Sequence, residues 1–298
     1  MKKVIITGIS GFVGQNVSKY LSGFYDVIGV GRNERVNYEN FSEINYDSII
    51  HLAGKAHDLK NVSKPNEYYQ VNFELTKKIY DSFLASQAQT FIFVSSVKAV
   101  ADEVDGVLIE SSTPNPQTHY GKSKLLAENY ILENIKPNKR VIILRPCIIH
   151  GEGNKGNLNL LFNIVKKGIP YPLGAFENKR SFLTITNLCF VIKEILDNEI
   201  IIAEVFNVSD DDAISTNELI ELINIALGKE VPILKVPKKI ILAIAKIGDT
   251  LKLPLTSEKL HKLTNNYVVS NKKILKFINK KLPHSTKDGL LKTFSTYK

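Results

Sequence analysis

A glycine-rich turn directly follows the first apolar run of this chain. The run occupies residues 4–6, and Gly8, Gly11 and Gly14 follow at intervals of three before a helical pattern that continues to Leu21. Glycine lets the backbone turn tightly and lets another backbone approach closely, because it carries no side chain. A strand, a glycine turn and a helix at the start of a chain predict the first unit of a parallel α/β sheet.

Strands and helices continue to alternate after this unit. Short apolar runs predict four more strands, and patterns with a helical period predict two long helices between them. The expected strands lie at 25–30, 47–53, 90–96 and 141–144, and the expected helices at 66–85 and 120–135. This alternation predicts an α/β fold with a doubly wound parallel sheet, the Rossmann fold, in which ligands bind at the carboxyl ends of the strands.

The pattern changes after residue 150, where loops rich in glycine and proline appear. We expect a dinucleotide-binding domain over residues 1–150, to which residues 180–210 return through a strand at 204–208. Residues 151–179 and 211–298 are expected to form a smaller mixed α/β lobe that binds the substrate. Further helices are expected at 158–167, 187–196, 216–227 and 238–251.

The glycine turn also predicts a nucleotide cofactor, because the amides at the start of a helix favour a pyrophosphate. After the second strand, Gly31 and Arg32 stand where an acidic residue would bind the ribose 2′-hydroxyl of NAD. An arginine favours the 2′-phosphate of NADP instead. We therefore expect NADP or NAD, with NADP favoured. Arg35 is a second candidate for the phosphate, and a solvated loop arginine is the alternative for Arg32.

Positive charge is concentrated in the last part of the chain. The net charge is +9, and residues 229–298 hold 16 lysines against 4 acidic residues, a net charge of +12. These lysines lack the interleaved aromatic residues of a surface that stacks nucleic-acid bases. A solvated basic lobe facing an anionic small substrate is therefore favoured over nucleic acid or an anionic membrane. The helix at 238–251 is amphipathic, yet no stable membrane insertion is expected.

Several absences in the sequence predict a cytoplasmic protein. No apolar run is long enough to span a bilayer, and the apolar stretch near the amino terminus is too short for a secretory signal. Cys147 and Cys189 stand in apolar surroundings without metal-ligand spacing. We expect both to be buried reduced thiols, and we expect no metal site.

Tyr120 and Lys124 are spaced by one helical turn, so they share a helix face. An ammonium beside a phenol stabilises the phenolate, which lowers the tyrosine pKa from about 10. Such a tyrosine can exchange protons with a sugar hydroxyl or carbonyl. The spacing alone also arises by chance in a chain this rich in tyrosine and lysine, so the pair gains its meaning from neighbouring motifs.

With these motifs in place, the chain resembles the extended short-chain dehydrogenase/reductase family, which contains NAD(P)-dependent nucleotide-sugar epimerases, dehydratases and ketoreductases. The resemblance covers nearly the whole chain. The motifs that carry it are Thr7–Gly14, His51–Gly54, Asn72, Ser95-Ser96, Tyr120–Lys124, Leu144–Pro146 and Arg180–Phe182.

The resemblance implies a catalytic group of Ser96, Tyr120 and Lys124, in which serine holds the sugar oxygen, tyrosine transfers the proton and lysine assists it. Ser96, Asn157 and Arg180 are implied substrate-binding residues; a helix cap is the alternative for Asn157 and a surface charge the alternative for Arg180. The implied cofactor-binding residues are Gly8, Gly11, Phe12, Val13, Gly14, Arg32, Leu52, Ala53, Gly54, Asn72, Tyr120, Lys124 and Pro146.

Departures from the family narrow the expected reaction. Val97 and Lys98 stand where 4,6-dehydratases place an Asp-Glu pair, so dehydration is excluded. The favoured activity is reduction of the C4 keto group of a UDP-linked 4-keto-6-deoxy-N-acetylhexosamine in bacterial polysaccharide biosynthesis. A UDP-sugar 4-epimerase with tightly bound NAD is the alternative. Two alternatives belong to other classes: a non-catalytic NAD(P)-binding protein, and a membrane-associated assembly protein that uses the basic lobe. The resemblance also implies a homodimer formed by the helices at 66–85 and 120–135.

Overall fold

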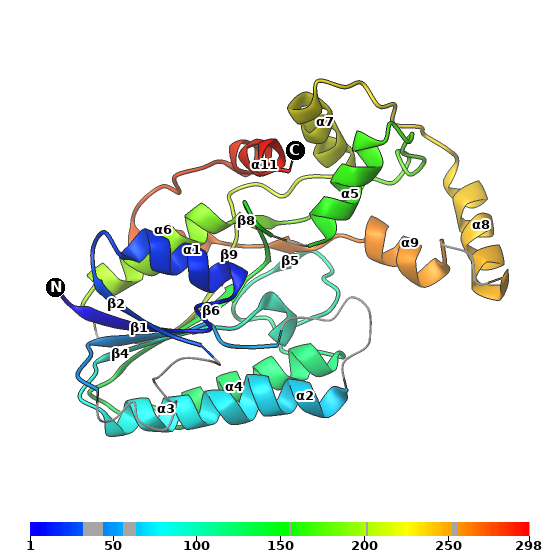
Figure 1. Cartoon of the computed structure of the whole chain (residues 1–298). Coiled ribbons are helices and arrows are strands. Elements are labelled where there is room, and N and C mark those ends of the chain that lie inside the picture. The colour runs from blue at the N-terminus through cyan, green and yellow to red at the C-terminus, as the bar shows by residue number, and fades with distance from the viewer. Residues whose placement is uncertain (32–43, 56–63, 155, 201, 252–254, 298) are drawn as a thin grey trace.

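A six-stranded parallel sheet forms the centre of the molecule (Figure 1). The computed structural model describes residues 1–31, 44–55, 64–154, 156–200, 202–251 and 255–297. The strands follow the order β2-β1-β3-β4-β6-β9. Their bounds are β1 Lys3–Thr7, β2 Asp26–Val30, β3 Ser48–His51, β4 Thr90–Val94, β6 Arg140–Pro146 and β9 Ala203–Val208. The order reverses at β1, so the ends of β1 and β3 mark the switch point of a doubly wound sheet, as the sequence predicts.

Helices cover both faces of this sheet. On one face lie α1 (Phe12–Leu21), α6 (Ile185–Asp197) and α10 (Lys272–Ile278), and on the other lie α3 (Leu75–Ala85) and α4 (His119–Glu133). The alternation of β1 shows why both faces need cover: Val4 and Ile6 join one core and Ile5 joins the other. The predicted fold class is therefore confirmed.

The predicted helix at 66–85 is one helical run with an irregular middle. It consists of α2 (Pro65–Tyr69), the π-helical segment η2 (Gln70–Glu74) and α3. A π-helical segment inserts an extra residue into the turn and often marks a functional position. Here it contains the buried Asn72.

A second core holds the smaller lobe together. The helices α5 (Asn157–Lys166), α7 (Thr216–Leu227), α8 (Lys238–Leu251), α9 (Ser257–Thr264) and α11 (Thr286–Ser295) contribute to it, with Phe162, Ile220 and Phe294 at its centre. Two short parallel pairs connect the parts: β7 (Ile148–His150) with β8 (Phe182–Thr184), and β5 (Val107–Leu108) with β10 (Val268–Val269). Because Val269 and Ile274 pack in the core of the large sheet, the carboxyl-terminal segment serves both parts. The predicted domain boundaries and the homodimer stay predictions.

Cys147 and Cys189 are buried free thiols, as predicted, and burial raises the pKa of both. Among the residues that the structure describes, no helix has the length and apolar character needed to cross a membrane.

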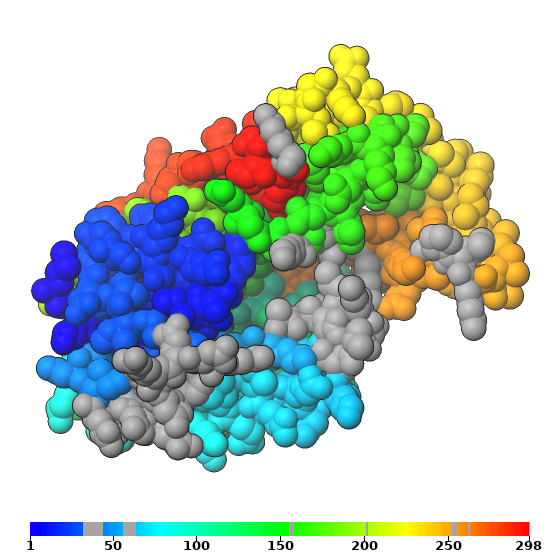
Figure 2. All heavy atoms as spheres, viewed as in Figure 1, coloured from blue at the N-terminus to red at the C-terminus, as the bar shows by residue number. Residues whose placement is uncertain are grey.

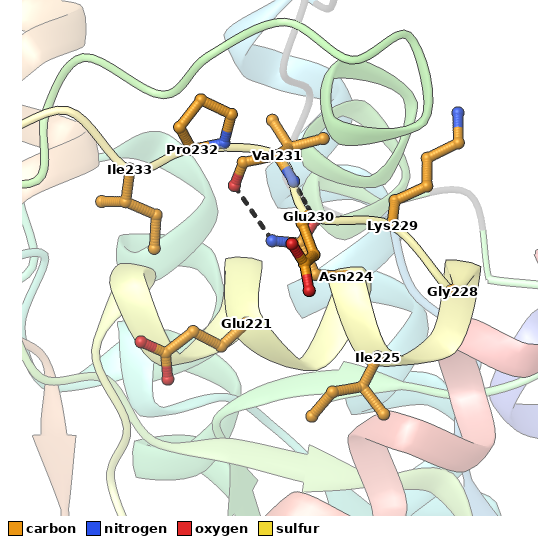
Figure 3. A pocket seen from close by; sticks show the side chains of 9 residues that line it. All are labelled: Glu221, Asn224, Ile225, Gly228, Lys229, Glu230, Val231, Pro232 and Ile233. Atoms are coloured by element: carbon orange, nitrogen blue, oxygen red, sulfur yellow. Dashed lines mark hydrogen bonds between the residues drawn. The ribbon is translucent and has the colours of Figure 1, made fainter.

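An open hollow follows the carboxyl end of α7 (Figure 3). Gly228 ends the helix in the left-handed conformation, with a φ of 62°. The Asn224 side chain then holds the next segment, because its Nδ2 donates to Val231 O at 3.0 Å and its Oδ1 accepts from Val231 N at 3.2 Å. None of the residues that line this hollow belongs to the predicted catalytic or cofactor site.

Candidate active site

The glycine turn joins the carboxyl end of β1 to the start of α1 at close quarters. Gly8 has a φ of 70°, and a Cβ there would lie 2.7 Å from Ala53 N, beyond the end of β3. A Cβ on Gly14 would lie 2.3 Å from Gly8 O. Gly11 is the N-cap of α1, and no side chain caps this helix. The amide end of α1 therefore faces the switch point of the sheet, which is the arrangement that binds a pyrophosphate.

A buried hydrogen-bond chain fixes the ends of β1 and β3. Thr7 Oγ1 accepts from Leu52 N and Ala53 N, each at 3.2 Å, and lies 2.7 Å from His51 Nδ1. His51 Nε2 lies 2.8 Å from Thr76 Oγ1, which donates to the backbone oxygen of Asn72 at 2.8 Å. This set is satisfied when the Thr7 hydroxyl donates to Nδ1 and a neutral His51 carries its proton on Nε2.

The buried position of His51 predicts acid sensitivity. Burial, followed by the charge of Lys124, lowers the pKa of His51 to about 3. Unfolded chains protonate histidine near pH 6.5, so below that pH the unfolded state binds a proton that the folded state refuses, and stability falls with decreasing pH. We expect about 2 kcal/mol of stability to be lost between pH 6.5 and 5. Urea unfolding across this range measures the loss, and an equal pH dependence in His51→Gln would contradict it.

Asn72 holds the loop after β3 against α4. Its Oδ1 accepts from Lys55 N at 2.7 Å, and its Nδ2 donates to Lys55 O at 3.1 Å and to Ser123 Oγ at 3.0 Å. A Cβ on Gly54 would lie 3.1 Å from Asn72 Oδ1 and 3.3 Å from Lys124 Nζ. Asn72 thus ties the loop after β3 to α4, and Gly54 leaves room for Lys124 Nζ. Direct contacts of either residue with a cofactor stay a prediction.

Ser96 and Tyr120 meet beyond the end of β4. Ser96 is buried and caps the short helix η3 (Val97–Ala99), accepting from Lys98 N at 3.2 Å. A side-chain hydrogen bond joins Ser96 to Tyr120. The Tyr68 ring lies edge-on to the Tyr120 ring, with centroids 6.3 Å apart. A hydroxyl pair at the carboxyl edge of the sheet is therefore formed by two segments far apart in the sequence.

Gly121 allows this meeting. A Cβ at that position would lie 2.3 Å from Lys98 O and 2.8 Å from the Pro116 side chain. Asp102 fixes the same junction, because its carboxylate accepts from the Thr118 hydroxyl and backbone amide, both at 3.1 Å. Thr118 in turn caps α4 by accepting from Gly121 N. These contacts set the distance between the start of α4 and the segment that carries Ser96.

We expect Gly121→Ala to push α4 away from η3. Overpacking of this kind costs about 1–3 kcal/mol, and the displaced Tyr120 loses its bond to Ser96, so turnover falls together with stability. Gly23→Ala is the matched control, because a Cβ on Gly23 meets nothing within 4 Å. Thermal unfolding and turnover of both variants check this; equal behaviour of the two would show that the α4 contact is not tight.

Lys124 is buried between β4 and α4. Its Nζ donates to Val94 O at 3.0 Å and lies 4.7 Å from the centroid of the Phe93 ring. Burial lowers the pKa of Lys124 to about 8, and the Glu128 carboxylate opposes this by raising it. The group is therefore poised to gain or lose its proton near neutral pH.

One prediction about this pair is wrong. The spacing predicts that Lys124 lowers the pKa of Tyr120, but burial raises this pKa, and the group that opposes the rise is Ser96. The physical reason is twofold. Burial disfavours the charged phenolate, and the Lys124 ammonium donates its hydrogen bond to Val94 O. Ser96 thus takes the role that the spacing assigned to lysine.

A buried ion pair that the sequence did not predict lies one helical turn beyond Lys124. Arg145 Nη2 lies 2.6 Å from Glu128 Oε2, and Arg145 Nε donates to both carboxylate oxygens at 3.1 Å. Glu128 belongs to α4 and Arg145 to β6, so the pair ties the helix that carries Tyr120 to the sheet. Two features of the sequence could have indicated this pair: Glu128 is four residues after Lys124, and Arg145 lies inside an apolar strand.

The structure tests the alternatives for the two predicted substrate-binding residues, Asn157 and Arg180. Asn157 is the first residue of α5, and Gly156 is the N-cap, so the helix-cap alternative for Asn157 is wrong. Arg180 is half-buried and its Nε donates to Asn265 O at 3.1 Å, which removes the surface-charge alternative. Burial lowers the pKa of Arg180, an effect that the nearby Tyr171 opposes. Arg32 and Arg35 lie outside the described residues.

Leu52, Ala53, Ser96 and Pro146 all lie at or just after the carboxyl ends of neighbouring strands. The structure thus brings them to the edge of the sheet where α1 begins and where Tyr120 and Lys124 lie.

Sequence comparison agrees with this geometry: the model of the NAD dependent epimerase/dehydratase family matches residues 4–209. The chain belongs to this family.

Relatives of known activity include epimerases. The chain is 32% identical over 263 residues to the UDP-glucose 4-epimerase of Vibrio cholerae, covering 79% of each chain. It is 30% identical over 251 residues to the N-acetyl-alpha-D-glucosaminyl-diphospho-ditrans,octacis-undecaprenol 4-epimerase of Escherichia coli O157:H7, covering 78% of this chain and 75% of that one.

Solved structures share the fold over nearly the whole chain. The UDP-glucuronic acid 4-epimerase from Bacillus cereus in complex with NAD superimposes with a TM-score of 0.78 at 18% identity, covering 99% of this family member and 98% of that chain. The structure of RMD from Pseudomonas aeruginosa complexed with NADPH gives 0.74 at 21% identity, covering 100% and 99%.

Proposed function

We propose that this family member is an NAD(P)-dependent enzyme that oxidises or reduces C4 of a sugar carried on a diphosphate. The observation that carries the proposal is the hydrogen-bonded Ser96–Tyr120 pair, with Lys124 one turn further along α4. A protein that only bound the nucleotide would have no need of a half-buried phenol paired with a serine and followed, one helical turn later, by a buried lysine whose pKa is about 8.

Each residue of the site has a distinct role in the proposed reaction. The nicotinamide cofactor supplies or accepts the hydride. Ser96 Oγ holds the C4 oxygen, and Tyr120 Oη donates a proton to that oxygen in reduction or removes it in oxidation. The Ser96 hydroxyl stabilises the phenolate as the proton leaves, and the Lys124 ammonium, held by Val94 O, would bind the nicotinamide ribose. The amides at the start of α1 hold the pyrophosphate.

A 4-epimerase is the first candidate. Two relatives at 30% identity or more are named as 4-epimerases, and both of their named sugars are attached to a diphosphate. The second candidate is the 4-ketoreductase of a UDP-linked 4-keto-6-deoxy-N-acetylhexosamine. It is favoured by Gly31 and Arg32, because a reductase draws on NADPH.

Direct assay separates the two candidates. The purified chain is incubated with UDP-glucose or UDP-N-acetylglucosamine without added cofactor, and products are separated by chromatography. C4 epimers, together with NAD released on denaturation and identified by mass spectrometry, support the epimerase. Oxidation of added NADPH by a UDP-linked 4-keto sugar supports the reductase. Neither reaction, in a protein that still binds the nucleotide, would refute both.

Arg32 decides the cofactor preference in this proposal. A guanidinium forms paired hydrogen bonds with a phosphate but gains little from a hydroxyl. Arg32→Ala is expected to weaken NADP binding by about 1.5–3 kcal/mol and to leave NAD binding nearly unchanged. Calorimetric titration with both nucleotides measures this, and the same titration of Arg35→Ala shows whether the second candidate arginine shares the role. Equal losses for NADP and NAD would show that Arg32 does not contact the 2′-phosphate.

A further inference from the structure

Helix α8 carries a second apolar face that points to solvent. Ile241, Ala245 and Gly248 are buried and attach the helix to the smaller lobe. Ile240, Ile244, Ile247 and Leu251 are exposed by 50%, 44%, 53% and 65%. Positions i, i+4, i+7 and i+11 lie on one line along a helix, so these four form a continuous stripe, the α8 stripe.

The four side chains of this stripe are exposed among the residues that the structure describes. The helix lies at the outer end of the smaller lobe, and its gold spheres project beyond the neighbouring elements in the space-filling view (Figure 2). Four large aliphatic side chains in a row are more than the scattered apolar residues of an ordinary surface, and such a patch marks an interaction site.

Lysines border the stripe on the side away from the protein. Lys239 and Lys246 each precede an isoleucine of the stripe, so they lie about 100° around the helix from it, opposite the buried Ile241. Neither forms an ion pair with a described residue. The acidic residue of α8, Asp249, is bound to the amide and hydroxyl of Ser257 at 2.8 and 2.6 Å. The cations are therefore free to face an anionic partner.

We propose that the α8 stripe docks this protein on the surface of an anionic lipid bilayer. With the stripe turned toward the acyl chains, the attached lobe and the two lysines occupy opposite flanks of the helix, both at the level of the headgroups. The 14-residue helix lies in the plane of the interface and does not cross it. This inference goes beyond the proposed function, because it holds whichever sugar is the substrate.

Charge selects a lipid surface over a second copy of the chain. In a symmetric contact between two α8 stripes, each copy would bring its own lysines to the same boundary. Residues 235–263 hold 7 lysines against 2 acidic residues, so two copies would repel each other. An anionic bilayer offers apolar chains and negative headgroups together, and so matches both features of the helix.

Vesicle flotation of the full chain tests the proposal. Wild-type protein is expected to float with vesicles of phosphatidylglycerol and phosphatidylethanolamine, and to float less as salt rises or when phosphatidylcholine replaces the anionic lipid. Ile247→Glu is expected to reduce the partition coefficient about tenfold or more. Lys246→Gln is expected to reduce it about fivefold on anionic vesicles.

Leu242→Glu is the matched control. Leu242 is 47% exposed on the same helix but lies about 160° from Ile240 around its axis, away from the α8 stripe. It should keep wild-type flotation. Ile247→Glu and Leu242→Glu should both keep the wild-type melting temperature, because neither side chain is buried. Absence of wild-type flotation, or equal loss in Ile247→Glu and Leu242→Glu, would overturn the proposal. So would a concentration-dependent dimer that Ile247→Glu abolishes while vesicle binding is absent. Turnover assays are separate, so failure of the proposed reaction leaves this test unaffected.

Discussion

Tyr120→Phe is expected to lower turnover by about 10²–10⁴-fold while leaving nucleotide binding nearly unchanged. The substitution keeps the ring and its edge contact with Tyr68 but removes the hydroxyl that is bonded to Ser96. Proton transfer at the C4 oxygen then lacks its donor in reduction and its acceptor in oxidation. Single-turnover kinetics across pH, with the nucleotide affinity measured in parallel, give the two quantities separately.

The matched control for this loss is Tyr68→Phe, which removes the phenol next to Tyr120 and leaves the Ser96–Tyr120 pair intact. It should retain most of the turnover. Because burial raises the pKa of Tyr120 and lowers that of Lys124, both groups favour their neutral forms more strongly than they would in water. Wild-type turnover in Tyr120→Phe would show that another group moves the proton and that the catalytic assignment is wrong at its centre.

The sheet and the glycine turn could be predicted because each depends on residues that are neighbours in the sequence. Apolar runs such as Phe91–Val94 are buried on both faces of a parallel sheet, so they need no alternation, and Gly8 needs its positive φ wherever the chain turns. The carboxyl-terminal helices α9 to α11 were missed. They are short and rich in lysine, and burial of residues such as Leu260 and Ile274 comes from tertiary contacts.

The candidate site was predicted as a set of residues but not as a network. Sequence motifs indicated Ser96, Tyr120 and Lys124, since their types and spacing suit proton transfer. The contact between Gly121 and Lys98 O joins residues more than twenty positions apart, and no pattern in the chain encodes it. The same holds for the sign of the Tyr120 pKa shift, because burial is a property of the packed structure and outweighs what the spacing suggests.

Breaking the buried pair of Glu128 and Arg145 is expected to destabilise the protein strongly. Glu128→Gln leaves the Arg145 guanidinium buried without its carboxylate, which costs about 3–5 kcal/mol. The exposed pair of Lys2 and Glu199 provides the control, and Glu199→Gln should leave stability nearly unchanged. Denaturant unfolding of the two variants measures the difference.

Replacing both partners distinguishes charge burial from packing. Combining Glu128→Leu with Arg145→Met removes the uncompensated charge, so stability should return close to that of the wild type. Turnover should not return in the same way: burial lowers the pKa of Lys124 to about 8, and without the Glu128 carboxylate this pKa falls further. The ammonium then loses its proton at a lower pH, and the fall of turnover at alkaline pH should begin earlier than in the wild type. If the double variant matched the wild type in its pH profile as well as in stability, Glu128 would act only as an anchor for α4 and would have no part in setting the charge of Lys124.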